Sequence, residues 1–149
     1  ETAAIVERGR ALPGAEAVLR RVGEDPAVLQ TLLTGNLAAN AAVKLSAFGL
    51  QEWLDLDVGA YGSDHADRKR LVPIARERAA TLRGRRFADD QIWVVGDTPN
   101  DLACARAGGV RCLLVASGRP SYGELAALQP DALLADLTDT ETVVGLLCS

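Results

Sequence analysis

The chain has 149 residues with 16 basic and 20 acidic side chains, a formal net charge of −4, and it is 48% hydrophobic but only 4% aromatic. This length fits one ordinary domain with a single core built from aliphatic side chains. The acidic balance argues against a nucleic-acid partner, and no apolar run approaches the ~20 residues that would span a bilayer, so we expect neither nucleic-acid nor membrane binding and a cytoplasmic location.

The three cysteines, Cys104, Cys112 and Cys148, have no short spacing, and His65 is the single histidine. This composition contains no zinc-finger or Cys-x-x-Cys pattern. Reduced cysteines are the expected state in a cytoplasmic protein.

The first half of the chain predicts a helix, a strand and a second helix. Residues 1–10 have mixed character, and Pro13-Gly14 opens a segment in which Ala17, Val18 and Val22 share one helical face. Residues 27–33 then read as a strand that ends at Thr34-Gly35-Asn36. An alanine-rich helix is expected over residues 37–48, closed by Gly49.

The second half continues the alternation of strands and helices. We expect a brief strand within residues 54–60, a polar loop, and a long helix over residues 68–82 with an apolar stripe that ends at Leu82. Further strands are expected at residues 92–95, 110–116 and 130–134, and helices at 102–107, 122–128 and 138–147. Such alternation indicates parallel pairing through right-handed crossovers and therefore an α/β, three-layer αβα Rossmann-like domain with a mostly parallel sheet.

Residues 92–101, Ile-Trp-Val-Val-Gly-Asp-Thr-Pro-Asn-Asp, form the most informative stretch. A short apolar run ends at Gly96, and Pro99 has the fixed φ that suits the first turn of a helix. Asp97 at the strand end and Asp101 one helical turn later can converge where open α/β sheets bind ligands. Carboxylate oxygens in this position suit Mg²⁺. The competing interpretation makes Asp97 only a helix N-cap and Asp101 only an acid near the helix dipole.

Polar groups that suit one anion follow three of the expected strands. They are Thr34 with Gly35 and Asn36, the basic residues near Lys69, and Asp97 with Asp101. Hydroxyl and backbone N–H groups hold phosphate oxygens, cations neutralise them, and carboxylates hold a metal that neutralises the rest. These are the parts of a phosphoryl-transfer site.

In order and spacing, these motifs resemble the haloacid dehalogenase (HAD) superfamily of aspartate-nucleophile phosphatases, in its phosphoglycolate-phosphatase-like form. Residues 32–36, Leu-Leu-Thr-Gly-Asn, are similar to the family's second motif, and residues 96–101 are similar to its fourth. The resemblance implies that Thr34, Gly35 and Asn36 bind the phosphoryl group. It also implies that Asp97 ligates Mg²⁺, supported by Asp101, and that the substrate is a small phosphorylated metabolite.

Two motifs depart from the family pattern. The family's third motif is a Lys, and Arg68 is the positional match here, with Lys69 and Lys44 as rivals. The first motif, a strand followed by D-x-D that supplies the nucleophile, has no counterpart before Pro13. Without a nucleophile the site can bind but cannot attack phosphorus.

We therefore expect residues 1–149 to be the carboxyl-terminal part of a HAD-like core domain from which the first strand and the cap domain are absent. The missing segment would come from the protein's own N-terminal region or from a second subunit, and its absence would leave the centre of the sheet exposed. The only D-x-D, Asp55 and Asp57, would serve as nucleophile in a permuted topology. A non-catalytic phosphate- or metal-binding module and a haloacid dehalogenase-type hydrolase remain alternatives.

Overall fold

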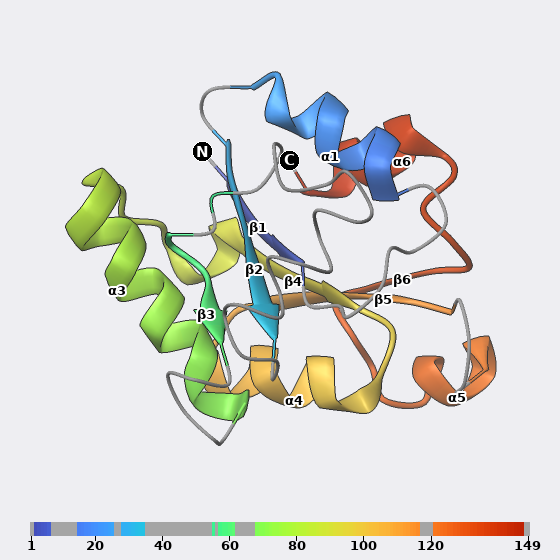
Figure 1. Cartoon of the computed structure of the whole chain (residues 1–149). Coiled ribbons are helices and arrows are strands. Elements are labelled where there is room, and N and C mark those ends of the chain that lie inside the picture. Colours follow the sequence, from blue (N-terminus) through green and yellow to red (C-terminus); the bar gives the residue numbers. More distant parts are fainter. Residues whose placement is uncertain are drawn as a thin grey trace.

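The structure is a computed structural model that describes residues 2–6, 15–25, 28–34, 55, 57–61, 68–116 and 121–147; residues 2–6, 15, 16, 32–34, 61 and 68 are described as backbone. Strands and helices alternate along most of it (Figure 1). The strands are β1 (Thr2–Val6), β2 (Val28–Thr34), β3 (Ala60–Tyr61), β4 (Ile92–Gly96), β5 (Arg111–Val115) and β6 (Ala132–Leu134). The helices are α1 (Ala15–Gly23), α3 (Leu71–Arg83), α4 (Pro99–Gly108), α5 (Tyr122–Ala126) and α6 (Thr140–Leu147), with short 3₁₀ turns η2 (Arg68–Arg70) and η3 (Asp89–Gln91).

The six strands form one sheet in the order β3-β2-β1-β4-β5-β6, and every neighbouring pair is parallel. Alternate side chains of β4 and β5 enter different apolar layers. Trp93 and Val95 pack with α1 and α6, while Ile92 and Val94 pack with α3 and α4. The expected three-layer αβα fold with a parallel sheet is confirmed.

Most of the expected elements are present near their predicted bounds. α1 buries Val18 and Val22, although Ala17 is exposed. β4 is buried at every position, as its continuous apolar run predicts. The expected helix over residues 37–48 lies outside the described residues, as do His65 and Trp53. None of the described helices has the length and apolar character needed to cross a membrane.

The first ten residues contain a strand that the sequence analysis did not predict. β1 pairs with β2 on one side and with β4 on the other, so that Val6 lies opposite both Leu32 and Val95. The expectation that the sheet would be open at its centre is therefore wrong. Ala3 and Ala4 have weak strand propensity, and pairing on both sides outweighs it here.

Two further expectations need correction. Among the described residues of the range 54–60, which are 55 and 57–60, Ala60 alone belongs to a strand, and residues 57 and 58 form a turn. Leu82, which was placed on the buried stripe of the long helix, is 51% exposed. Leu82 lies in the last turn of α3, beyond Ala79, the last buried residue of the helix, and Gly84 ends the helix in a left-handed conformation with φ of 63°.

α3 and α4 approach each other closely at Gly108. A Cβ atom there would lie 2.6 Å from Cγ1 of Val72. We expect Gly108→Ala to lower the free energy of unfolding by about 1–3 kcal/mol, because the added methyl group overpacks this contact.

Urea denaturation of the purified chain measures the change. Gly145→Ala in α6 is the matched control, since a Cβ there meets no atom within 4 Å. The control should gain about 0.5–1 kcal/mol from helix propensity. Equal midpoints for the two variants would contradict the close approach of α3 and α4.

Candidate active site at the carboxyl end of β4

The candidate site begins where β4 leaves the sheet. Gly96 is the last residue of the strand, and Asp97 follows it with 5% of its surface exposed. Thr98 has extended backbone angles and is the N-cap of α4, whose first residue is Pro99. The interpretation of Asp97 as the helix cap is therefore wrong, because Thr98 has that role and Asp97 stands one residue before it.

Asp101 holds this junction together. Its Oδ2 accepts hydrogen bonds from the backbone N–H of Asp97, the backbone N–H of Thr98 and the hydroxyl of Thr98, each at 2.9 Å. The Thr98 hydroxyl in turn lies 3.4 Å from the Asp101 backbone nitrogen and accepts from it, which completes a reciprocal capping box. Asp101 thus fixes the backbone that carries Asp97.

The strand can end this way only because residue 96 is glycine. A Cβ atom on Gly96 would collide with the carboxylate of Asp101, which packs directly against the glycine backbone. Any side chain there would displace the acceptor of three hydrogen bonds. The Gly-Asp-x-x-x-Asp spacing is therefore a steric requirement of this turn.

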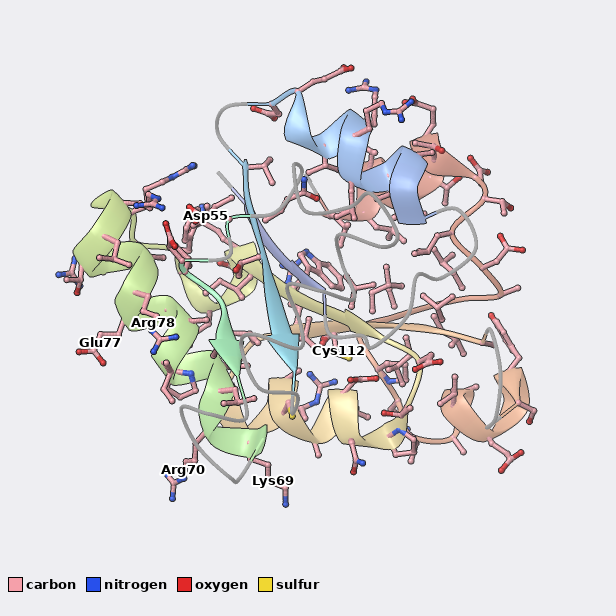
Figure 2. All side chains as sticks on the ribbon, in the orientation of Figure 1. Asp55, Lys69, Arg70, Glu77, Arg78 and Cys112 are labelled. Atoms are coloured by element: carbon pink, nitrogen blue, oxygen red, sulfur yellow. The ribbon has the colours of Figure 1, made fainter. Side chains whose placement is uncertain are left out.

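The negative charge of Asp101 extends to the neighbouring strand. Burial, followed by the nearby charge of Asp101, raises the pKa of the Cys112 thiol on β5 to about 12. Cys112 lies beneath the sheet close to α4 (Figure 2). At neutral pH this thiol is uncharged, and it serves as a small apolar core residue.

The backbone of Thr34 lies at the same edge of the sheet as Asp97. Val6 of β1 is opposite Leu32 on one side and Val95 on the other, so β2 and β4 end on either side of β1. Thr34 itself pairs with Tyr61 of β3. The Thr34 side chain is not among the described atoms, and Gly35, Asn36 and Lys44 lie outside the described residues.

The positive residues of the third-motif region belong to the turn that enters α3. Arg68, described as backbone, begins η2, and η2 packs against α4. Lys69 and Arg70 are exposed, at the end of α3 away from Asp55 (Figure 2). The structure therefore brings Asp97 and Asp101 together and places η2 beside the helix that carries Asp101.

The D-x-D pair lies away from this site. The Asp55 backbone N–H donates to the Gln30 carbonyl, and Asp55 accepts a 2.6 Å hydrogen bond from Thr31 through its own carbonyl, so Asp55 sits beside the middle of β2. Nε and Nη2 of Arg83 bind its carboxylate at 2.7 and 3.0 Å, and Nη2 lies 3.2 Å from Asp57. These hydrogen bonds raise the pKa of Arg83.

Because α3 starts at η2 and ends at Arg83, this ion-paired cluster lies at the opposite end of α3 from η2. The use of Asp55 as a nucleophile in a permuted topology is therefore wrong. The pair anchors the segment before β3 to the end of α3.

Sequence reasoning missed the role of Thr98. Its signal was present, because Thr-x-x-Asp at residues 98–101 is a variant of the capping-box pattern that precedes a helix. Asp101 both completes the capping box of α4 and binds the backbone N–H of Asp97 at the end of β4. The hydrogen bond to Asp97 depends on the fold of the turn and has no sequence signal of its own.

Within the described residues, no group of three or more Asp, Glu, His or Cys side chains could hold a metal. This excludes a closed structural cage from that part of the chain. Mg²⁺ is usually bound through one or two carboxylates with waters and substrate phosphate completing the coordination. Asp97, with Asp101 behind it, fits that requirement.

A family profile, a curated relative and solved structures that resemble this chain carry similar descriptions. A family profile described as HAD-hydrolase-like matches residues 70–140, from the last residue of η2 to the first residue of α6. A phosphoglycolate phosphatase from Photorhabdus laumondii is 28% identical over 116 residues. That match covers 77% of this chain and 47% of the relative, so the chain spans about half of the relative's length.

Solved structures share the fold. One, described as a predicted phosphoglycolate phosphatase from Haemophilus somnus, superposes with a TM-score of 0.69 at 19% identity and covers 91% of this chain and 57% of its own. A haloacid dehalogenase-like hydrolase from Streptococcus pneumoniae gives a TM-score of 0.68 at 16% identity, covering 90% and 60%. At these identities the likeness establishes the fold alone.

We expect Asp101→Ala to lower the free energy of unfolding by about 2–4 kcal/mol, because it removes the acceptor of two backbone N–H groups, one of them buried, together with half of the capping box. Thr98→Ala should cost only about 1 kcal/mol, since Asp101 keeps its backbone partners. Urea denaturation measures both changes. A larger loss in Thr98→Ala than in Asp101→Ala would show that the hydroxyl, and not the carboxylate, holds the junction.

Proposed function

We propose that this chain, which is HAD-like and related to phosphoglycolate phosphatases, carries the metal-binding and phosphate-binding part of a Mg²⁺-dependent phosphate monoester hydrolase. The observation that supports this most directly is the position of Asp97. It is a buried carboxylate at the carboxyl end of a central parallel strand, and its backbone N–H is fixed by Asp101. Parallel α/β sheets bind their ligands at this edge.

Asp97 is the proposed Mg²⁺ ligand, with Asp101 in support. One Asp101 oxygen, Oδ2, is committed to three hydrogen bonds, so its main contribution is to orient the turn that carries Asp97. The ion, when bound, would neutralise charge on the phosphate oxygens. The protein's own part is to fix the backbone that carries Asp97 at a buried position, which lowers the entropy lost on metal binding.

The phosphate-binding part of the proposal rests on Thr34, Gly35, Asn36 and a nearby cation. Support comes from the parallel ends of β2 and β4, which stand at one sheet edge on either side of β1. Arg68 at the start of η2 is the proposed third-motif cation, and Lys44 is proposed as a substrate contact. Hydroxyl and backbone N–H donors at a strand end suit phosphate oxygens, and a guanidinium can bind them in a bidentate manner.

The proposed substrate is a small phosphorylated metabolite, and the proposed location is the cytoplasm. The nucleophile is proposed to come from a segment outside the present sequence, either the protein's own N-terminal part or a second subunit. β1 holds the place between β2 and β4 that the family's first strand is expected to take. The expectation that this strand is absent is therefore wrong, and what the present sequence lacks after β1 is the D-x-D motif.

A second candidate is a non-catalytic phosphate- or metal-binding module. It is favoured by one observation, the engagement of both carboxylates of the D-x-D pair by Arg83. Haloacid dehalogenation is a further alternative with the same nucleophile requirement.

The test of metal binding is calorimetric titration of the chain with MgCl₂. We expect Asp97→Asn to weaken Mg²⁺ binding at least 10-fold, because it removes the charge of the proposed ligand. Asp90→Asn is the matched control, because Asp90 is exposed on η3, just before the opposite end of β4, and its loss should change the affinity less than 2-fold. Equal affinity in wild type and Asp97→Asn would end the metal assignment.

The test of activity is a phosphate-ester panel with Mg²⁺, applied to the chain alone and to the chain with its upstream region restored. We expect turnover only in the restored protein, reduced roughly 10²-fold by Thr34→Val, the scale of one oxyanion donor. Arg68→Ala should lower turnover more than Lys44→Ala does. Restored protein that binds Mg²⁺ and phosphate but hydrolyses no ester would favour the non-catalytic module.

A further inference from the structure

A second concave site lies at the end of β4 away from Asp97. A cavity of about 590 Å³ is bounded by one face of α3, the segment 85–87 and Ile92, the first residue of β4. Four residue steps of β4 separate Ile92 from Gly96, or about 13 Å. The cavity is therefore distinct from the candidate active site, and its size falls in the range of small-molecule sites.

The lining of this cavity is positively charged in a chain whose net charge is −4. Arg76, Arg85 and Arg86 contribute three guanidinium groups, of which Arg76 is paired with Asp89, and Glu77 is the one acidic residue among the described residues that line the cavity. Like charges gathered around one concave surface repel one another, and the low-dielectric walls focus the resulting field. An anion in the cavity would relieve this repulsion.

Two of the three arginines are held in place by the protein. Nη1 of Arg76 donates to Asp89 at 2.7 Å and Nη2 donates to the Phe87 carbonyl at 3.0 Å. The Arg85 guanidinium lies over the Phe87 ring, 5.2 Å from its centroid. Prior fixing of these groups reduces the entropy that a bound anion would cost.

Arg86 completes the set. It is exposed and lines the cavity, and within the described part of the chain it makes no hydrogen bond or ion pair. An arginine with all of its donors available, beside two that are already oriented, matches the bidentate geometry of a phosphate. Acidic partners for Arg86 would be expected if the cluster served only to stabilise the fold.

The remaining lining residues indicate a ligand with an organic part. Glu77 and Thr81 lie one helical turn apart on α3 and provide a carboxylate acceptor and a hydroxyl. Figure 2 shows Glu77 directed away from the sheet, on the outer side of α3, while Arg78 leaves the helix on another side, where it donates to the Gly59 carbonyl. The outer plane of Arg85, stacked on Phe87, offers a surface for a flat ring.

We propose that this cavity, lined by Arg76, Arg85, Arg86, Glu77 and Thr81, binds a small organic phosphate of about the size of a nucleoside monophosphate. The phosphate is held by Arg86 and Arg85 and the organic part by Glu77, Thr81 and the Arg85–Phe87 stack. The proposal does not depend on the proposed function, because it concerns the opposite end of β4 and is tested by binding alone.

The experiment is titration of the ¹⁵N-labelled chain with AMP in EDTA, followed by amide chemical shifts and by calorimetry. We expect shifts at Thr81, Phe87 and Ile92, and weaker binding of inorganic phosphate than of AMP. Arg86→Gln should weaken AMP binding about 10-fold, and the double variant Arg85→Gln with Arg86→Gln should weaken it further. Raising the salt concentration should weaken it as well.

Arg21→Gln is the matched control, because it removes the same charge from an exposed position on α1, in the layer on the other face of the sheet. It should change AMP affinity less than 2-fold. Shifts confined to residues 96–101 would show that AMP binds only at the candidate active site and would overturn the proposal. Undetectable AMP binding at millimolar concentration, or equal affinity in wild type and Arg86→Gln, would overturn it too, and phosphate binding as tight as AMP would remove the organic part.

Discussion

The carboxylate of Asp101 is the interaction on which the candidate site depends. Its Oδ2 accepts from two successive backbone N–H groups and one hydroxyl, and it packs against a glycine that leaves it room. A buried backbone N–H without an acceptor costs about 1–3 kcal/mol, so this one oxygen decides whether the chain can turn from β4 into α4 inside the protein. Asp97 takes its position from that turn, so the proposed metal site depends on the same hydrogen bonds.

The elements that could be predicted are those whose signals are local. The apolar run of β4, closed by glycine and followed by proline, specifies a buried strand and a helix start without reference to the rest of the chain. β1 was not predicted although Thr2, Ile5 and Val6 are β-branched, because the two alanines between them weaken the local pattern and its pairing partners are 26 and more residues away. The exposure of Leu82 likewise could not be predicted, because periodicity alone does not show that the buried face of α3 ends at Ala79.

The candidate site shows the same division. The spacing of Asp97 and Asp101 predicted that they would lie together, and the structure brings them into contact through a hydrogen bond from the Asp97 backbone N–H to the Asp101 carboxylate. The location of Asp55 and Asp57 does not follow from their motif. Their partner Arg83 is 28 and 26 residues away, at the end of a helix whose direction is a property of the whole fold. The sequence of a short acidic motif therefore does not say whether its carboxylates form an ion pair or line a site, because that depends on where the fold places them.

The central position of β1 also has a consequence for how this chain folds. Ala3 pairs with Ile92, so the middle of the sheet joins residues from near the beginning of the chain with residues beyond its midpoint. Bringing Ala3 and Ile92 together closes a long loop, and the entropy lost in doing so is offset only after β1 has paired with β4. Domains dominated by such non-local pairing fold orders of magnitude more slowly than helical bundles of the same size. During synthesis the edge of β1 that pairs with β4 has no partner until β4 has emerged, and an unpaired strand edge of this kind favours aggregation.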